Sequence, residues 1–207
     1  MLLSRIALDV DKRSTLIALQ NPSHFHGAIE RAFEPRTSRA LWRVDMLHGQ
    51  RYMLLLSEET PDLTSFVEQF GTGDAPEMRN YTPLLERVEA GTRWQFRLCA
   101  NPTYSQFNEK GGRGKICAHK TVEHQCGWLL EQSEKHGFVV NADEFNVVNI
   151  KWYSFKKSKL DKDVRLLSVT YEGLLTVTDA QKFRDALTGG IGRGKAYGMG
   201  LLTIVRA

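Results

Sequence analysis

The sequence predicts an α+β protein built from two tandem ferredoxin-like domains. Three observations lead to this prediction. Segments with strand and helix patterns follow the order βαββαβ in residues 1–88, and the same order returns in residues 89–207. Apolar residues alternate in the strand segments and recur at helical spacing in the helix segments. The chain of 207 residues is long enough for two domains of this size.

The first half carries the pattern of one βαββαβ unit. Strands are expected in four segments: residues 2–10, 40–46, 51–57 and 81–88. Two amphipathic helices are expected between them, one reaching Phe33 and one reaching Phe70. Each expected helix opens with a capping residue followed by proline, at Asn21-Pro22 and at Thr60-Pro61. Residues 71–83 are expected to form a loop.

The second half repeats the pattern with longer strands. Strands are expected in five segments: residues 94–100, 136–140, 146–155, 165–177 and 201–205. A helix is expected over 121–136, and a second one follows Thr178 and Gln181, which have capping-box spacing. Residues 103–118 form a polar, glycine-rich loop in this prediction. RNA-recognition motifs share this topology, but a fold does not fix a function.

Composition places the chain among ordinary globular proteins. Hydrophobic residues make up 42% and charged residues 25%, with a net charge of +4, which suits a polyanionic partner. The three cysteines form no CxxC pair, which favours reduced thiols and a cytoplasmic location. Arg5 and Asp9 interrupt the apolar N-terminal segment, so we expect neither a signal peptide nor a membrane partner.

His26 is the first candidate functional residue. It lies in the first turns of an expected helix, at the edge of the apolar stripe, where the helix dipole keeps an imidazole neutral and available as a base. A half-buried structural histidine bonded to a backbone carbonyl is the alternative, and the pattern alone favours it. His24 points to nearly the opposite side, so the two histidines do not form a metal pair.

The stretch GIGRGKAYGMG, residues 190–200, is the most specific local signal. Together with Gly189 it approaches a Walker A loop, but Ala196 replaces the hydroxyl residue that binds Mg²⁺, and no large sheet follows. Clustered backbone N–H groups beside two cations instead predict a phosphate cradle. The residues of this candidate cradle are Gly190, Gly192, Arg193, Gly194 and Lys195.

Two further segments are rich in charge or in potential metal ligands. Lys156, Lys157 and Lys159 lie in a predicted hairpin turn, which is either a solvated turn or a basic tip that enters a nucleic-acid groove. The segment CAHKTVEHQC, residues 117–126, has two cysteines and two histidines, but its spacing matches no common structural zinc pattern. We therefore expect no metal site there.

These motifs give the chain a family resemblance. Over nearly its whole length it resembles the CasE family, the pre-crRNA endoribonucleases of type I-E CRISPR Cascade complexes and a branch of the RAMP superfamily. The motifs that carry the resemblance are NPSHFH, ALWRV, FRLCANP, WLL, YEGLLTV and GGIGRGKAYGMGLLTI. The last of these is the glycine-rich RAMP signature. Some family members have tyrosine where this chain has Ser23, and many have arginine where it has Cys99.

The resemblance implies a function and its residues. It implies cleavage of CRISPR repeat stem-loops without metal or cofactor, by attack of the substrate's own 2′-OH, and continued association with the crRNA and other Cascade subunits. It implies a catalytic role for His26, as base or acid. It also implies RNA contacts for the lysine turn (Lys156, Lys157 and Lys159) and for the glycine loop. A RAMP protein that binds RNA without cleaving it is the alternative.

Overall fold

The computed structural model describes residues 1–33, 38–107, 114–156 and 163–207. The N-terminal half contains these elements: β1 (Leu2–Ala7), α1 (Arg13–Gln20), α2 (Ser23–Arg31), β2 (Leu41–Leu47), β3 (Gln50–Ser57), α3 (Thr64–Phe70) and β4 (Glu77–Asn80). Its strands pair in the order β2-β3-β1-β4, and every pair is antiparallel. This strand order is that of a ferredoxin-like domain, as predicted.

The C-terminal half repeats the arrangement after a short helix, α4 (Thr82–Glu86). Its elements are β5 (Arg93–Ala100), β6 (Thr103–Gln106), β7 (Lys115–Ala118), α5 (Val122–Lys135), β8 (Phe138–Val139), β9 (Phe145–Phe155), β10 (Val164–Val177), α6 (Ala180–Gly189), the 3₁₀ turn η1 (Lys195–Tyr197) and β11 (Leu202–Arg206). The sheet order is β11-β5-β10-β8, and β9 pairs with β10. Two ferredoxin-like units are therefore confirmed, while the predicted division after residue 88 stays a prediction.

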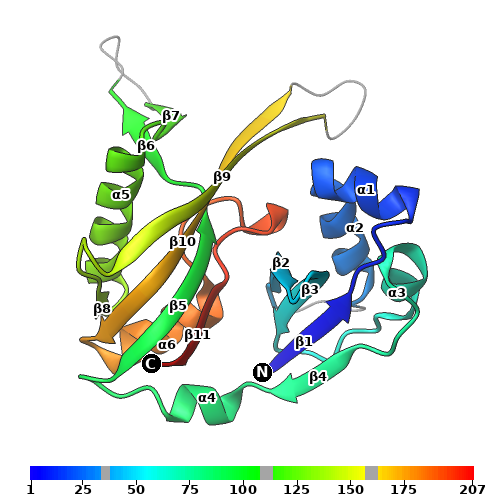
Figure 1. Ribbon diagram of the computed structural model, residues 1–207, viewed down its shortest axis with the longest axis horizontal. Coiled ribbons are helices and arrows are strands. Elements are labelled where there is room, and N and C mark those ends of the chain that lie inside the picture. The colour runs from blue at the N-terminus through cyan, green and yellow to red at the C-terminus, as the bar shows by residue number, and fades with distance from the viewer. Residues whose placement is uncertain (34–37, 108–113, 157–162) are drawn as a thin grey trace.

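Apolar side chains form one core cluster under each sheet. In the N-terminal half Phe25, Phe66 and Phe70 pack ring against ring, with centroids 5.0 to 5.9 Å apart. The larger cluster surrounds Tyr171 and Phe183 in the C-terminal half, and it also takes in Leu41, Leu56 and Tyr81 from the first 88 residues. Figure 1 shows the two halves side by side, with η1 between them.

A buried arginine joins the halves. Arg43 on β2 is 3% exposed and holds Asp45 through Nε and Nη2, at 2.6 to 3.0 Å. Its Nη1 donates to the carbonyl oxygens of Arg97 and Leu201, and its Nη2 donates to Thr203 Oγ1. Because these acceptors belong to β5, β11 and the residue just before β11, one guanidinium crosslinks both domains with its donors satisfied.

The predicted strand at residues 81–88 was wrong, because Thr82–Glu86 forms α4. The last strand of the first unit is β4, inside the predicted loop, and all four of its residues are exposed. An edge strand exposed on both faces has no apolar alternation to reveal it. Helix α1 was missed for a similar reason, since its buried residues are Thr15 and Ala18 while Leu16 and Ile17 are exposed.

Smaller differences concern element ends. The predicted loop 103–118 contains the hairpin β6–β7, whose side chains are mostly exposed. Helix α3 begins at Thr64 rather than directly after Thr60-Pro61. The cap of α6 is Asp179 rather than Thr178, and its carboxylate accepts from the N–H groups of Gln181 and Lys182.

Candidate functional site

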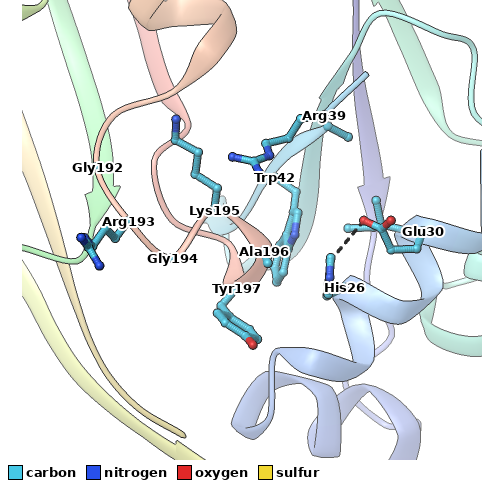
Figure 2. A pocket seen from close by; sticks show the side chains of 12 residues that line it. His26, Glu30, Arg39, Trp42, Gly192, Arg193, Gly194, Lys195, Ala196 and Tyr197 are labelled. Carbon is cyan, nitrogen blue, oxygen red and sulfur yellow. Dashed lines mark ion pairs between the residues drawn. The ribbon is translucent and has the colours of Figure 1, made fainter. Parts of the chain in front are cut away.

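A cleft of about 660 Å³ lies between helix α2 and the glycine loop that precedes β11. The described residues that line it come from both halves of the chain: His26, Ile29, Glu30, Arg39, Ala40, Trp42 and residues 192–197. Figure 2 shows His26 and Glu30 on one side, the loop residues on the other and the Trp42 ring between them. The structure thus brings two predicted features, His26 and the loop, to one site.

His26 is held by the packing of its helix. Its neighbours Phe25, Ala28 and Ile29 are buried against the N-terminal sheet, which leaves the His26 side chain 36% exposed at the edge of the apolar stripe. Its Nδ1 lies 3.4 Å from Oε1 of Glu30, one helical turn later. A proton on Nδ1 directed at this carboxylate leaves Nε2 as the acceptor nitrogen.

The glycine loop has a backbone that side chains would disturb. Gly190, Gly192, Gly194, Gly198 and Gly200 all have positive φ, between 73° and 93°. At Gly198 an added Cβ would lie 2.6 Å from the Trp42 ring, so the loop packs directly against β2 of the other half. Two backbone hydrogen bonds close the loop. The N–H of Ile191 donates to the carbonyl oxygen of Gly200 at 2.9 Å, and the N–H of Gly200 donates to that of Cys99 at 2.6 Å.

Two cations, Lys195 and Arg39, lie near enough in the cleft to repel each other. Lys195 Nζ donates to the carbonyl oxygen of Gly189 at 2.6 Å. Burial lowers the pKa of Lys195, and the positive charge of Arg39 lowers it further. An anion placed here would relieve this repulsion, which makes the pair a candidate phosphate site. Arg193 also lines the cleft, but Figure 2 shows its side chain pointing away from His26.

An aromatic ring connects the cleft to the β9–β10 hairpin. Tyr197 in η1 has its ring centroid 6.3 Å from that of His26 and 5.2 Å from that of Phe155, at the end of β9. The next residue, Lys156, has a 59% exposed side chain whose Nζ lies 4.0 Å from Asp163. Lys157 and Lys159, also predicted to contact RNA, lie outside the described residues. Figure 1 shows this hairpin extending toward α1.

Comparison with known proteins decides the family. A family model described as CRISPR associated protein matches residues 1–206. The chain belongs to this CRISPR-associated family. It is 28% identical over 218 residues to the CRISPR-associated endoribonuclease Cse3 of Thermus thermophilus, covering 99% of both chains. It is also 28% identical over 126 residues to the Cascade subunit CasE of Escherichia coli, covering 57% of this chain and 60% of CasE.

The solved structures agree with this assignment. A structure of Thermus thermophilus Cse3 bound to an RNA representing a pre-cleavage complex matches with a TM-score of 0.80 and 26% identity. The match covers 99% of this chain and 98% of Cse3. The resemblance to the CasE family is therefore confirmed.

Both departures from the CasE pattern lie outside the cleft lining in this CRISPR-associated chain. Ser23 Oγ donates to Asn21 Oδ1 at 2.6 Å, at the start of α2. Cys99 is buried 3.0 Å from Ser168 Oγ, and burial raises the pKa of its thiol. Neither residue is among the described ones that line the cleft around His26.

Several cleft residues of this CRISPR-associated protein were not predicted from sequence. Glu30 carried a usable signal, since it follows His26 by four residues on the same helix. Tyr197 lies inside the glycine motif but has no charge to mark it. Arg39 and Trp42 reach the site through the contact between the two halves, which no local pattern records. Of the helices within the described ranges, none is long and apolar enough to cross a membrane.

Proposed function

We propose that this protein is an endoribonuclease that cleaves CRISPR repeat stem-loops in pre-crRNA and stays bound to the crRNA as a subunit of a type I-E Cascade complex. The supporting observation is the cleft itself, where His26 with its Glu30 partner faces a glycine loop that carries cations. The 28% identity to an endoribonuclease across 99% of both chains supports the same reaction. The three free cysteines support a cytoplasmic location for it.

The proposed chemistry is an internal transesterification. The 2′-oxygen of the substrate forms a bond to the adjacent phosphorus while the bond from phosphorus to the 5′-oxygen breaks, which leaves a 2′,3′-cyclic phosphate and a 5′-hydroxyl. The proton leaves the 2′-hydroxyl and one is delivered to the 5′-oxygen. His26 performs one of these transfers, a role that contributes about 10²–10⁴-fold to a rate. The nucleophile belongs to the substrate, so the scheme needs no metal or cofactor.

The other cleft residues have electrostatic and positioning roles in this proposal. Glu30 orients the imidazole of His26 through Nδ1. The cations Arg39 and Lys195, with the N–H groups of the glycine loop, stabilise the charge that develops on the phosphorane oxygens. Arg193 and Lys156 contact the phosphates of the flanking stem, together with Lys157 and Lys159, which the sequence predicts to lie in a turn. A-form RNA offers mainly its shape and phosphates for such contacts.

The test compares two repeat RNAs in excess EDTA. One is all-ribose, and the other has a single 2′-deoxy nucleotide on the 5′ side of the scissile phosphate. We expect equal binding of both, but cleavage of the all-ribose RNA alone, because the nucleophile is absent from the other. Binding without cleavage of either RNA would show a non-catalytic RAMP subunit. Cleavage of the deoxy substrate at a normal rate would disprove the mechanism.

A further inference from the structure

A second surface with the chemistry of a nucleic-acid site lies away from the His26 cleft. It is a hollow of about 890 Å³ between the β6–β7 hairpin, the start of α5 and strands β9 and β10. Its rings and cations define what we term the aromatic–basic surface: Tyr104, Lys115, His119, Lys120, Trp152 and Arg165. Figure 1 shows β6 and β7 across β9 from helices α1 and α2.

Strand geometry puts this surface on the opposite face of β9 from the interdomain side. Lys151 reaches toward the N-terminal half, where its Nζ donates to Leu19 O at 2.8 Å. Trp152 is the next residue, and successive side chains of a strand point to opposite faces. Trp152 pairs with Leu167 of β10, so Arg165, two residues before Leu167, lies on the same face as Trp152.

The two largest rings on this surface are exposed, and one of them has imidazole rings beside it. Trp152 is 52% and Tyr104 is 45% exposed, although large aromatic side chains are normally buried. The Tyr104 ring lies 4.9 Å from that of His119, and the His119 ring lies 5.8 Å from that of His124. Partial burial, and then the neighbouring imidazole of His124, lowers the pKa of His119.

The charges on this surface all have one sign. Lys115, Lys120 and Arg165 contribute three cations, and the described lining residues include no aspartate or glutamate. Within the part of the chain that the structure describes, none of these three cations is paired with a carboxylate. Exposed rings flanked by unpaired cations match the requirements of unpaired bases and their phosphates, since every base offers a face for stacking.

We propose that the aromatic–basic surface binds a single-stranded RNA segment, with bases stacked on Trp152 and Tyr104 and phosphates at Lys115, Lys120 and Arg165. Bases inside a stem are stacked on each other, so a duplex would leave these rings unused. That the ligand is RNA rests on the proposed function, whereas the site is distinct from the cleft around His26. A protein partner is the competing occupant, but it would not need three unpaired cations around the rings.

The chain carries its own fluorescent reporter for this site. Trp42, Trp94 and Trp128 are buried, at 3%, 5% and 6% exposed, whereas Trp152 is 52% exposed. A short oligouridylate, which forms no stem, should therefore quench the emission of Trp152 and shield it from acrylamide. Trp152→Phe should lose the quenching yet keep most of the affinity, because an aromatic ring is kept. Trp152→Ala should weaken binding about five- to hundredfold.

Controls separate stacking from charge and from protein contacts. Val205→Ala removes an exposed apolar side chain of β11 outside this surface and should bind oligouridylate like the wild type. Inorganic polyphosphate has charge without bases and should leave Trp152 emission unchanged. Unchanged emission at saturating oligouridylate, or normal affinity of Trp152→Ala, would overturn the proposal. Shielding of Trp152 by other Cascade subunits but not by RNA would also overturn it, in favour of a protein interface. All of these measurements report binding, so their results do not depend on whether the protein cleaves RNA.

Discussion

At the scale of single residues, the proposed role of Glu30 is to orient the imidazole of His26. The i,i+4 spacing puts the Glu30 carboxylate 3.4 Å from Nδ1, and the 43% exposed side chain of Glu30 adds little to the stability of α2. Glu30→Ala should slow cleavage about tenfold, because a misoriented His26 loses part of the roughly 10²–10⁴-fold rate enhancement that a general acid or base contributes. Glu30→Gln keeps an oxygen acceptor and should recover most of the rate.

Spectroscopy distinguishes this positioning role from a structural one. The imidazole ¹⁵N shifts of His26 should show the proton on Nδ1 in the wild type and in Glu30→Gln, but a mixture of tautomers in Glu30→Ala. The thermal midpoint of unfolding should stay nearly constant across the three proteins. Equal rates and equal tautomer populations in Glu30→Ala would remove Glu30 from the mechanism.

At the scale of elements, the glycine loop is the part of the site that tolerates least change. Gly198 has φ of 78°, and its added Cβ would meet the Trp42 ring at 2.6 Å. Gly198→Ala should therefore lower the free energy of unfolding by about 1–3 kcal/mol, from αL strain and displacement of the ring. The affinity of this variant for RNA should also fall. Gly189→Ala is the matched control, because its Cβ meets nothing within 4 Å. Equal stability of both variants, measured by chemical denaturation, would contradict the packing described for the loop.

Local patterns explain how much of the site could be predicted from the sequence. The glycine loop was predicted because its G-h-G repeat is visible within a few residues. For His26 the local pattern favoured a structural histidine, and only the family resemblance implied a catalytic role. Helix α1 was missed because its buried face consists of Thr15 and Ala18, which give no apolar periodicity. Strand β4 was missed because all of its side chains are exposed. In both elements the tertiary contacts, rather than the residue pattern, determine the structure.

At the scale of the whole molecule, the cleft exists because the two ferredoxin-like units are fixed to each other. Arg43 crosslinks β2 to the backbone of β5 and of Leu201, and Trp42, its neighbour, fills the space under the glycine loop. These contacts join residues more than 50 positions apart, so no window of the sequence predicts them. The same arrangement sets the aromatic–basic surface on one face of β9, while Lys151 on the opposite face contacts Leu19 of the N-terminal half.

The most direct test of the account compares two histidine variants of helix α2 in single-turnover cleavage of repeat RNA. His26→Ala should cut about 10²–10⁴-fold more slowly than the wild type, while its affinity for the uncleaved RNA stays nearly intact, since a proton-transfer residue contributes mainly in the transition state. His24→Ala, two residues away and exposed, should cleave at the wild-type rate. Normal cleavage by His26→Ala would contradict the central claim that this cleft is the catalytic site.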